Sequence, residues 1–204
     1  MRPFAYAIPF LIPLSMAPGH ALANDSAYTD LDTDHCKSLL PEDTEGGSIS
    51  LRCKGFKDYA VYFKEGDLRQ SILYGPASDA YIDNVFESFE PFNTATRKIE
   101  WRLGANGKPV ATILRWFLEN IDPATYEPSP KLKGQVLVVS KVADDDGQGC
   151  VVGYVDALAN PEPNLLARQV ADTRAGAFVC GRDLAGYHGI RGSTAAEPTR
   201  VFPD

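Results

Sequence analysis

The chain has 204 residues, with 27 acidic and 20 basic side chains, a formal net charge of −7 and a hydrophobic fraction of 44%. This hydrophobic fraction argues against a disordered chain, and the length suits one domain with at most a tail. The acidic balance argues against nucleic acid or an anionic membrane surface as a partner.

Residues 1–23 have the pattern of a secretory signal peptide. Arg2 gives a positively charged start, residues 4–16 are apolar and uncharged, and Ala21 and Ala23 form the small-residue pattern that precedes a cleavage site. The apolar stretch is shorter than the roughly 20 residues that a membrane-spanning helix needs. We therefore expect cleavage after Ala23 and a periplasmic or secreted protein with no membrane span.

Residues 24–47 form a polar, acidic arm. The residues that follow it have the alternation that is typical of strands. Apolar and polar side chains alternate at 49–53, at 59–64 and at 68–74, and Gly66 lies between the last two segments. Two alternating segments joined by a short turn that contains glycine are typical of a β-hairpin.

The spacing of apolar residues changes after this hairpin. Ser78 is a suitable N-cap, and apolar side chains follow at helical spacing as far as Phe89, before Pro91. The pattern predicts a helix near 79–89 with an aromatic stripe in the core.

Two further hairpins are predicted in the second half of the chain. Alternation at 98–103 and 110–118 flanks the turn residues 104–107, and the apolar segment 136–139 is followed by a turn and by an apolar segment at 150–155.

A second helix is predicted at 161–174. Asn160 is placed as its N-cap, Pro161 as its first residue, and Arg174 near its negative end. Together these elements predict an α+β fold, with an antiparallel sheet of about six or seven strands and two packed helices. We expect one globular domain at 24–180 and a loose C-terminal tail at 181–204.

All four cysteines lie after the predicted signal peptide, which fits two disulfides in an oxidising compartment. Three pairings are possible, and the simplest joins sequence neighbours, Cys36 with Cys53 and Cys150 with Cys180. No CxxC or CxxH spacing supports a zinc site.

Four segments carry a resemblance to other proteins: Glu100-Trp101-Arg102-Leu103, Ala111-Thr112-Ile113-Leu114-Arg115, Gly149-Cys150-Val151-Val152-Gly153-Tyr154-Val155, and the stretch from Asn160-Pro161 to Cys180-Gly181. Taken together, they resemble a group of small exported bacterial proteins without a characterised activity. The resemblance implies export and supports the pairing of Cys150 with Cys180. It implies no activity, so no catalytic residue is transferred from it.

Two acidic clusters invite a calcium interpretation, and both miss the required spacing. Counted from Asp30, positions six and twelve of a calcium loop would be His35 and Pro41, where the loop needs glycine and glutamate. Residues 144–147 have three consecutive aspartates and a glycine, which is more typical of a solvated turn. We expect no metal and no cofactor.

The hairpin at 98–118 carries the candidate ligand-binding residues Trp101, Arg102, Arg115 and Trp116. Arginine and tryptophan together can recognise a carboxylate or a sugar face. The alternative, which we favour, is a sheet with both tryptophans in the core and both arginines on the solvent face.

No motif in the sequence identifies a catalytic centre. His35 and His188 lack the partners of a nucleophilic triad, and no Gly-rich phosphate-binding motif is present. The sequence therefore favours a non-enzymatic binding protein of the bacterial cell envelope, with an unidentified envelope protein or small ligand as its partner. The alternative is a small periplasmic hydrolase that uses carboxylates, whose separation in space the sequence does not reveal.

Overall fold

The computed structural model describes residues 25–41, 46–145 and 147–203. The described chain is built mostly from antiparallel strands, with two α-helices and two disulfides. These coarse features agree with the predicted fold class, although the sheets dominate over the helices. The predicted signal peptide, at 1–23, lies outside the described residues.

The larger sheet contains two of the predicted hairpins. Its strand order is β1-β8-β9-β12-β13, and the short strand β7 pairs with one end of β9. The bounds are Asp25–Asp30 for β1, Phe92–Ala95 for β7, Lys98–Leu103 for β8, Pro109–Glu119 for β9, Gly134–Lys141 for β12 and Cys150–Asp156 for β13. The hairpins β8–β9 and β12–β13 lie where alternation and turn residues predicted them.

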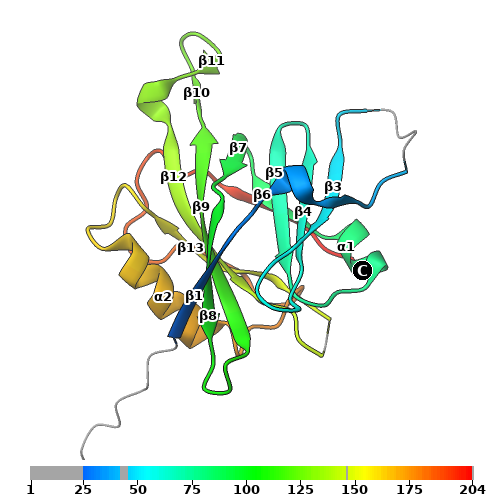
Figure 1. The fold of residues 1–204 in the computed structure, drawn as a ribbon. Helices are drawn as coiled ribbons and strands as arrows, with labels where there is room; N and C mark the ends of the chain where they lie inside the picture. Colours follow the sequence, from blue (N-terminus) through cyan, green and yellow to red (C-terminus); the bar gives the residue numbers. More distant parts are fainter. Residues whose placement is uncertain (1–24, 42–45, 146, 204) are drawn as a thin grey trace, which may run out of the picture.

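A second sheet of four strands contains the remaining predicted hairpin, β4–β5. The strands in order are β2 at Lys37–Ser38, β3 at Ile49–Cys53, β4 at Val61–Gly66 and β5 at Arg69–Tyr74. The sequence predicted one sheet, whereas the described residues form two larger sheets that face each other (Figure 1). Each has an apolar face that must be buried, and packing these faces together satisfies both.

The remaining elements are short. Two-stranded pairs form between β6 and β14 and between β10 and β11, and two 3₁₀ turns precede β2 and β12. Their bounds are Phe86–Phe89 for β6, Pro198–Val201 for β14, Ile121–Asp122 for β10, Glu127–Pro128 for β11, and Thr33–His35 and Pro130–Leu132 for the two 3₁₀ turns.

Three apolar clusters join the layers. The largest lies between the two sheets and contains Tyr74, Trp101 and Trp116. A second cluster packs helix α2, at Pro163–Arg174, on the outer face of the larger sheet. The third packs helix α1, at Asp79–Asn84, on the smaller sheet. The helices therefore cover opposite outer sides of the molecule (Figure 1).

The predicted helix over 79–89 is wrong beyond its first half. Ser78 does cap α1, because its hydroxyl accepts a hydrogen bond from the backbone N–H of Tyr81 (3.2 Å). The helix ends at Asn84 with Val85 as its C-cap, and residues 86–89 form β6, where the backbone N–H of Glu87 donates to the Ser71 hydroxyl (3.0 Å). Pairing of β6 with the distant strand β14 outweighs the helical spacing of its apolar residues.

The predicted start of the second helix is also wrong, by two residues. Glu162 is its N-cap and Pro163 its first residue, so the role expected of Pro161 belongs to the next proline. The Asn160 side chain instead donates to the carbonyl groups of Asp156 (2.9 Å) and Ile190 (2.7 Å) and accepts from the Ile190 N–H (2.9 Å). Asn160 thus anchors the C-terminal segment.

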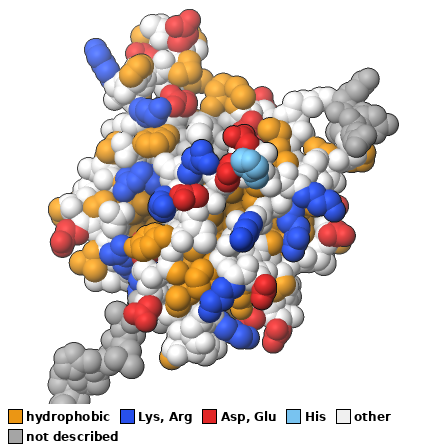
Figure 2. Space-filling view, viewed as in Figure 1, with side chains coloured by type: hydrophobic (Ala, Val, Ile, Leu, Met, Phe, Trp, Pro, Cys, Tyr) orange, Lys and Arg blue, Asp and Glu red, His pale blue; other side chains and the backbone are white. Residues whose placement is uncertain are grey.

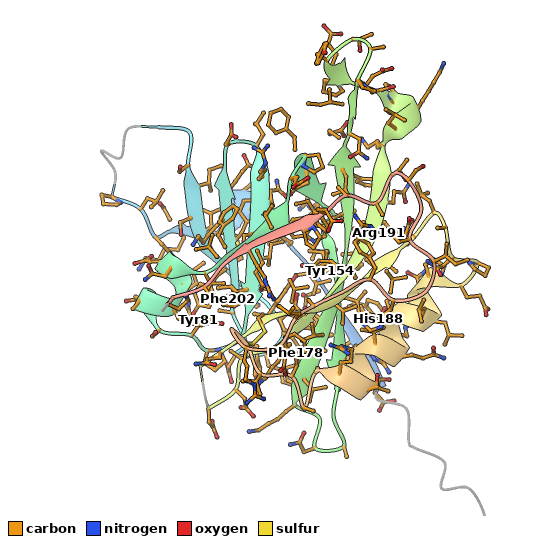
Figure 3. All side chains as sticks on the ribbon, turned by 180° about the vertical axis from the view of Figure 1, so that it is seen from behind. Tyr81, Tyr154, Phe178, His188, Arg191 and Phe202 are labelled. Carbon is orange, nitrogen blue, oxygen red and sulfur yellow. A yellow bond between two sulfur atoms is a disulfide. The ribbon has the colours of Figure 1, made fainter. Side chains whose placement is uncertain are left out.

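Residues 181–203 return across the domain instead of forming the loose tail that the sequence suggested. The backbone of Tyr154 hydrogen-bonds to Gly186 (3.0 Å) and His188 (2.8 Å), and the Gly192 N–H donates to Asp156 Oδ2 (2.8 Å). Figure 3 shows this segment passing over the back of the molecule, with His188 and Arg191 along it and Phe202 near its end.

Both disulfides have the predicted local pairing. Cys36–Cys53 joins the first arm of the chain to β3, and Cys150–Cys180 joins β13 to the segment after α2. The described residues contain no free cysteine.

Candidate functional site

Strand alternation separates the four predicted ligand-binding residues onto two faces of the larger sheet. Trp101 and Trp116 are 0% and 3% exposed and belong to the core between the sheets. Arg102 and Arg115 lie on the other face, the face on which α2 packs. The structure therefore places the tryptophans in the core, as we favoured, and does not bring them together with the arginines.

Arg102 departs from the favoured interpretation because it is buried rather than on a solvent face. Its side chain is 5% exposed and forms a two-bond contact with Asp172 on α2, from Nε to Oδ1 (3.0 Å) and from a terminal nitrogen to Oδ2 (2.7 Å). The other terminal nitrogen donates to the Ser26 hydroxyl. These contacts occupy the guanidinium group and fix α2 against the sheet.

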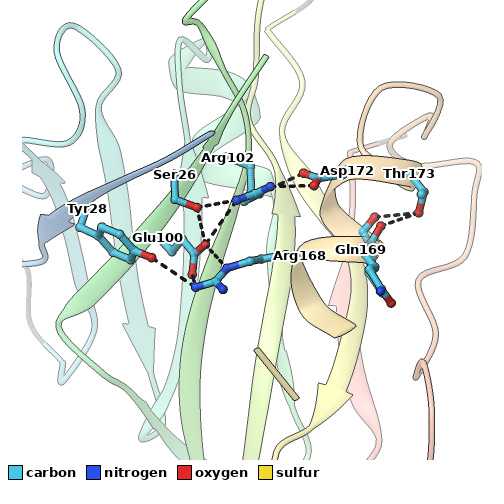
Figure 4. Close-up of polar contacts among 9 residues, drawn as sticks. Ser26, Tyr28, Glu100, Arg102, Arg168, Gln169, Asp172 and Thr173 are labelled. Atoms are coloured by element: carbon cyan, nitrogen blue, oxygen red, sulfur yellow. Dashed lines mark hydrogen bonds and ion pairs between the residues drawn. The ribbon is translucent and has the colours of Figure 1, made fainter. Parts of the chain in front are cut away.

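A second arginine, Arg168 on α2, binds the carboxylate of Glu100 on β8 (Figure 4). Arg168 Nε donates to Glu100 Oε1 (2.6 Å), and a terminal nitrogen donates to Oε2 (3.2 Å) and to the Tyr28 hydroxyl (3.3 Å). The Ser26 hydroxyl also donates to Glu100 Oε1 (2.6 Å). Glu100 thus links β1, β8 and α2.

These contacts keep Glu100 ionised. Burial disfavours its charged form, but hydrogen bonds from Arg168 and Ser26 and the positive charges of Arg168 and Arg102 outweigh burial and hold the pKa of Glu100 below its usual value of 4.5. The same pairing raises the pKa of Arg168. Glu100 is therefore suited to positioning Arg168 rather than to donating a proton.

Arg115, on β9, differs from both because its partners are neutral. One terminal nitrogen donates to Gln135 Oε1 (3.1 Å), and the other lies 3.4 Å from Asn164 Oδ1, on the first turn of α2. Within the described ranges, no carboxylate forms an ion pair with Arg115. Its positive charge is therefore not neutralised by a direct contact.

Arg115 borders a groove of about 450 Å³ on this face of the sheet. The side chains of Ile113 and Leu137, which are 4% and 3% exposed, form the apolar floor. The remaining lining residues are polar: Tyr28, Thr96, Lys98, Glu100, Arg115, Asn164 and Arg168. Figure 2 shows charged and hydrophobic side chains mixed on this side of the molecule, over β1, β8 and α2.

The charges around the groove do not cancel. Arg168 is matched by Glu100, and the Lys98 ammonium group lies 2.9 Å from Asp30 Oδ1. Arg115 adds one positive charge. Since its guanidinium group has donors beyond those used by Gln135 and Asn164, the groove is suited to an anion with an apolar portion.

Sequence reasoning missed most of this groove. Arg168 and Asp172 lie one turn apart on α2, and each contacts an opposite charge on β8. The sequence did contain a signal for these contacts. Glu100 and Arg102 lie two residues apart on one face of a strand, and Arg168 and Asp172 carry the opposite charges one turn apart on a helix. Tyr28 and Asn164 carried no signal, because their contribution depends on how the layers pack.

The acidic clusters in the sequence do not form a metal site in the described residues. His35 Nδ1 lies 2.8 Å from Asp32 Oδ2, and Arg97 lies 3.3 Å from the other Asp32 oxygen. No three His, Cys, Asp or Glu side chains of the described chain gather closely enough to hold an ion. Part of the turn at 144–147 lies outside the described residues.

The carboxyl group with the most suitable pKa for proton transfer lies in the interior. Burial raises the pKa of Glu87 to about 8, against smaller opposing effects from the Val151 N–H and Arg200. Glu87 is 4% exposed, on β6 between the sheets, where a substrate does not reach it. The His188 ring lies close to Gly153, and burial followed by the charge of Arg174 lowers its pKa.

Comparisons with known proteins add no assignment. No family model matches the chain, and no significant match is found among curated proteins or solved structures. In the described part of the chain, neither helix is long and apolar enough to cross a membrane.

Proposed function

We propose that this protein is an exported, non-enzymatic binding protein of the bacterial cell envelope, and that its groove binds a small ligand with one carboxylate and an apolar body. The observation that carries this proposal is the Arg115 guanidinium group, which has only neutral partners among the described residues and stands beside the apolar floor of Ile113 and Leu137.

The chemistry of recognition follows from these groups. A carboxylate forms strong, directional hydrogen bonds with a guanidinium group, and two parallel bonds fix its orientation. The apolar body of the ligand would lie on Ile113 and Leu137 beside the Tyr28 ring. Glu100 holds Arg168 in place at the wall of the groove, so the site is ordered before the ligand arrives.

An NMR titration tests the proposal with benzoate as the probe and benzamide as its uncharged analogue. We expect benzoate to shift the backbone signals of residues that line the groove, and benzamide to bind at least about tenfold more weakly because it lacks the charge. Shifts that are equal for the two compounds, or that map elsewhere, would refute the assignment of the groove.

A pair of matched variants shows whether Arg115 is responsible. Arg115→Gln removes the cation beside the floor, whereas Arg52→Gln removes a cation of the same kind from an exposed position on β3 of the smaller sheet. We expect the first variant to lose benzoate binding and the second to keep it. Equal loss in both would indicate non-specific attraction by surface charge.

Export is tested separately by the mass of the protein recovered outside the cytoplasm. The two disulfides fit an oxidising compartment, and the pattern before Asn24 predicts where processing occurs. The exported form is expected to begin at Asn24. An intact leader on that form would contradict the signal-peptide prediction and leave the groove proposal to its own test.

The hydrolase alternative also stays a prediction, with a distinct test. A screen with esterase, peptidase and glycosidase substrates should be repeated on Glu100→Gln, since Glu100 is the carboxylate that lines the groove. Turnover that this substitution abolishes would replace the binding proposal with the enzymatic one.

A further inference from the structure

A small cavity lies between the two sheets, away from the groove. Its volume is about 10 Å³, close to the space that one water molecule needs, and every residue that lines it is buried. The polar side chains in its wall include Glu87 on β6, Trp116 on β9, Ser140 on β12 and Tyr154 on β13. Figure 3 places Tyr154 near the middle of the molecule.

Two residues that line this cavity each have a buried polar atom without a hydrogen-bond partner in the described part of the chain. The atoms are Oε1 of Glu87 and Nε1 of Trp116, whose residues are 4% and 3% exposed. The second Glu87 oxygen, Oε2, accepts a hydrogen bond from the Val151 N–H (2.7 Å). Buried polar groups are almost always hydrogen-bonded, and ordered water supplies the partner where protein groups do not.

We propose that one water molecule occupies this cavity and bridges the free oxygen of the Glu87 carboxyl group and the indole N–H of Trp116. The water oxygen accepts the hydrogen bond from Trp116 Nε1. It also accepts from Glu87, which carries its proton on Oε1 because Oε2 is engaged as an acceptor. The two hydrogens of the water remain for acceptors in the wall, such as the Ser140 hydroxyl.

The charges around Glu87 are consistent with a protonated acid at neutral pH. Burial raises its pKa to about 8, and Arg200 on the facing strand β14 opposes this only in part. Tyr154 on β13 and Tyr74 on β5 are the other titratable groups in the wall, and burial raises the pKa of both hydroxyls, so they stay neutral.

Water-selective NOE and ROE spectra of the unmodified protein test the site. We expect the indole proton of Trp116 to show cross peaks with water that have opposite signs in the two spectra, as for a bound water molecule. Trp101 is the comparison for this effect, because its indole N–H donates to the Thr29 hydroxyl (2.8 Å) and shows what an exchangeable side-chain proton alone produces. No water peak at Trp116 would overturn the proposal.

Glu87→Gln removes the remaining ambiguity, because a carboxyl proton that exchanges rapidly with solvent can imitate a bound water molecule. The glutamine has a similar shape and no such proton, so the Trp116 cross peaks should persist in the variant. Their loss, with the fold intact, would show that the carboxyl proton caused them and would overturn the proposal. If the variant does not fold, a high-resolution crystal structure of the unmodified protein decides the question: density within hydrogen-bond distance of both atoms supports the water, and its absence refutes it.

Discussion

The two faces of the larger sheet bury polar groups in opposite ways. Against the inner face, Glu87 of β6 is held among aromatic and aliphatic side chains, and its pKa is raised to about 8. On the outer face, Glu100 is also largely buried, but Arg168, Arg102 and Ser26 surround it and its pKa is lowered. One face therefore keeps a carboxyl group neutral, and the other keeps one charged.

The difference shows that burial alone does not determine the state of an acid. Desolvation is the largest effect on the pKa of both carboxyl groups, and the partners decide the direction of the result. Because strands alternate, neighbouring residues of β8 supply both environments: Trp101 faces the apolar interior, and Glu100 and Arg102 face the charged network. The apolar side chains of the inner face stabilise the fold. The charged side chains of the outer face join α2 to the sheet and border the groove as well.

The largest expected effect is the pH dependence that Glu87 introduces. The unfolded chain releases this proton near pH 4.5, whereas the folded protein retains it to about pH 8, so stability falls as pH rises through this range and is constant above it. Each unit of pKa difference is worth about 1.4 kcal/mol, which makes the full effect roughly 5 kcal/mol. In denaturant unfolding between pH 4 and 9, the free energy of unfolding of Glu87→Gln relative to that of the unmodified protein should rise by this amount. A constant difference between the two proteins would contradict the buried neutral acid.

The next effect concerns packing on the inner face. Trp116→Ala should lower the free energy of unfolding by about 3–5 kcal/mol, because it removes a large side chain from the core between the sheets. Phe117→Ala is the matched control, since the next residue of β9 points to the other face and is half-buried. Phe117→Ala should lower the free energy of unfolding clearly less than Trp116→Ala does in the same denaturant titration. Equal losses would show that the two faces do not differ in packing.

A smaller effect is expected from the ion pair beneath α2. Arg102→Gln leaves Asp172 without its two-bond partner and should cost about 2–3 kcal/mol, less than for a fully buried pair because the Asp172 side chain is 22% exposed. Adding Asp172→Asn should recover part of this loss. Strictly additive effects in this double-mutant cycle would show that the two side chains do not stabilise each other.

The smallest effect on stability is expected from Arg115→Gln, the same substitution on the same face of the sheet. Arg115 has no carboxylate partner among the described residues, so the free energy of unfolding should change by no more than about 0.5 kcal/mol. Thermal unfolding measures this directly. A loss as large as that of Arg102→Gln would mean that Arg115 serves the fold, and would weaken its assignment to ligand binding.

Elements that depend on local pattern were predicted well from the sequence. The β4–β5, β8–β9 and β12–β13 hairpins followed from alternation and turn residues, and both disulfides joined sequence neighbours. The burial of Trp101 and Trp116 followed from the same alternation. In each case the information lies within one short stretch of chain.

Elements that depend on distant partners were not predicted. Phe86 and Phe89 fit helical spacing, and only the pairing of β6 with β14 makes them a strand. The groove likewise brings Tyr28 on β1 together with Arg115 on β9 and Arg168 on α2. Its position depends on how α2 lies on the sheet, and no local pattern encodes that.

The first and last described strands each pair with a strand far away in the sequence, and this affects the order of folding. β1, the first described strand, completes the edge of the larger sheet at β8, and β14, close to the last described residue, pairs with β6. Contacts between such distant segments form late, and an unpaired strand edge is prone to association with other chains. Because a chain is synthesised from its N-terminus, β6 would stay unpaired until β14 has been completed. Factors that bind exposed strand edges would then act mainly in the interval before β14 pairs with β6.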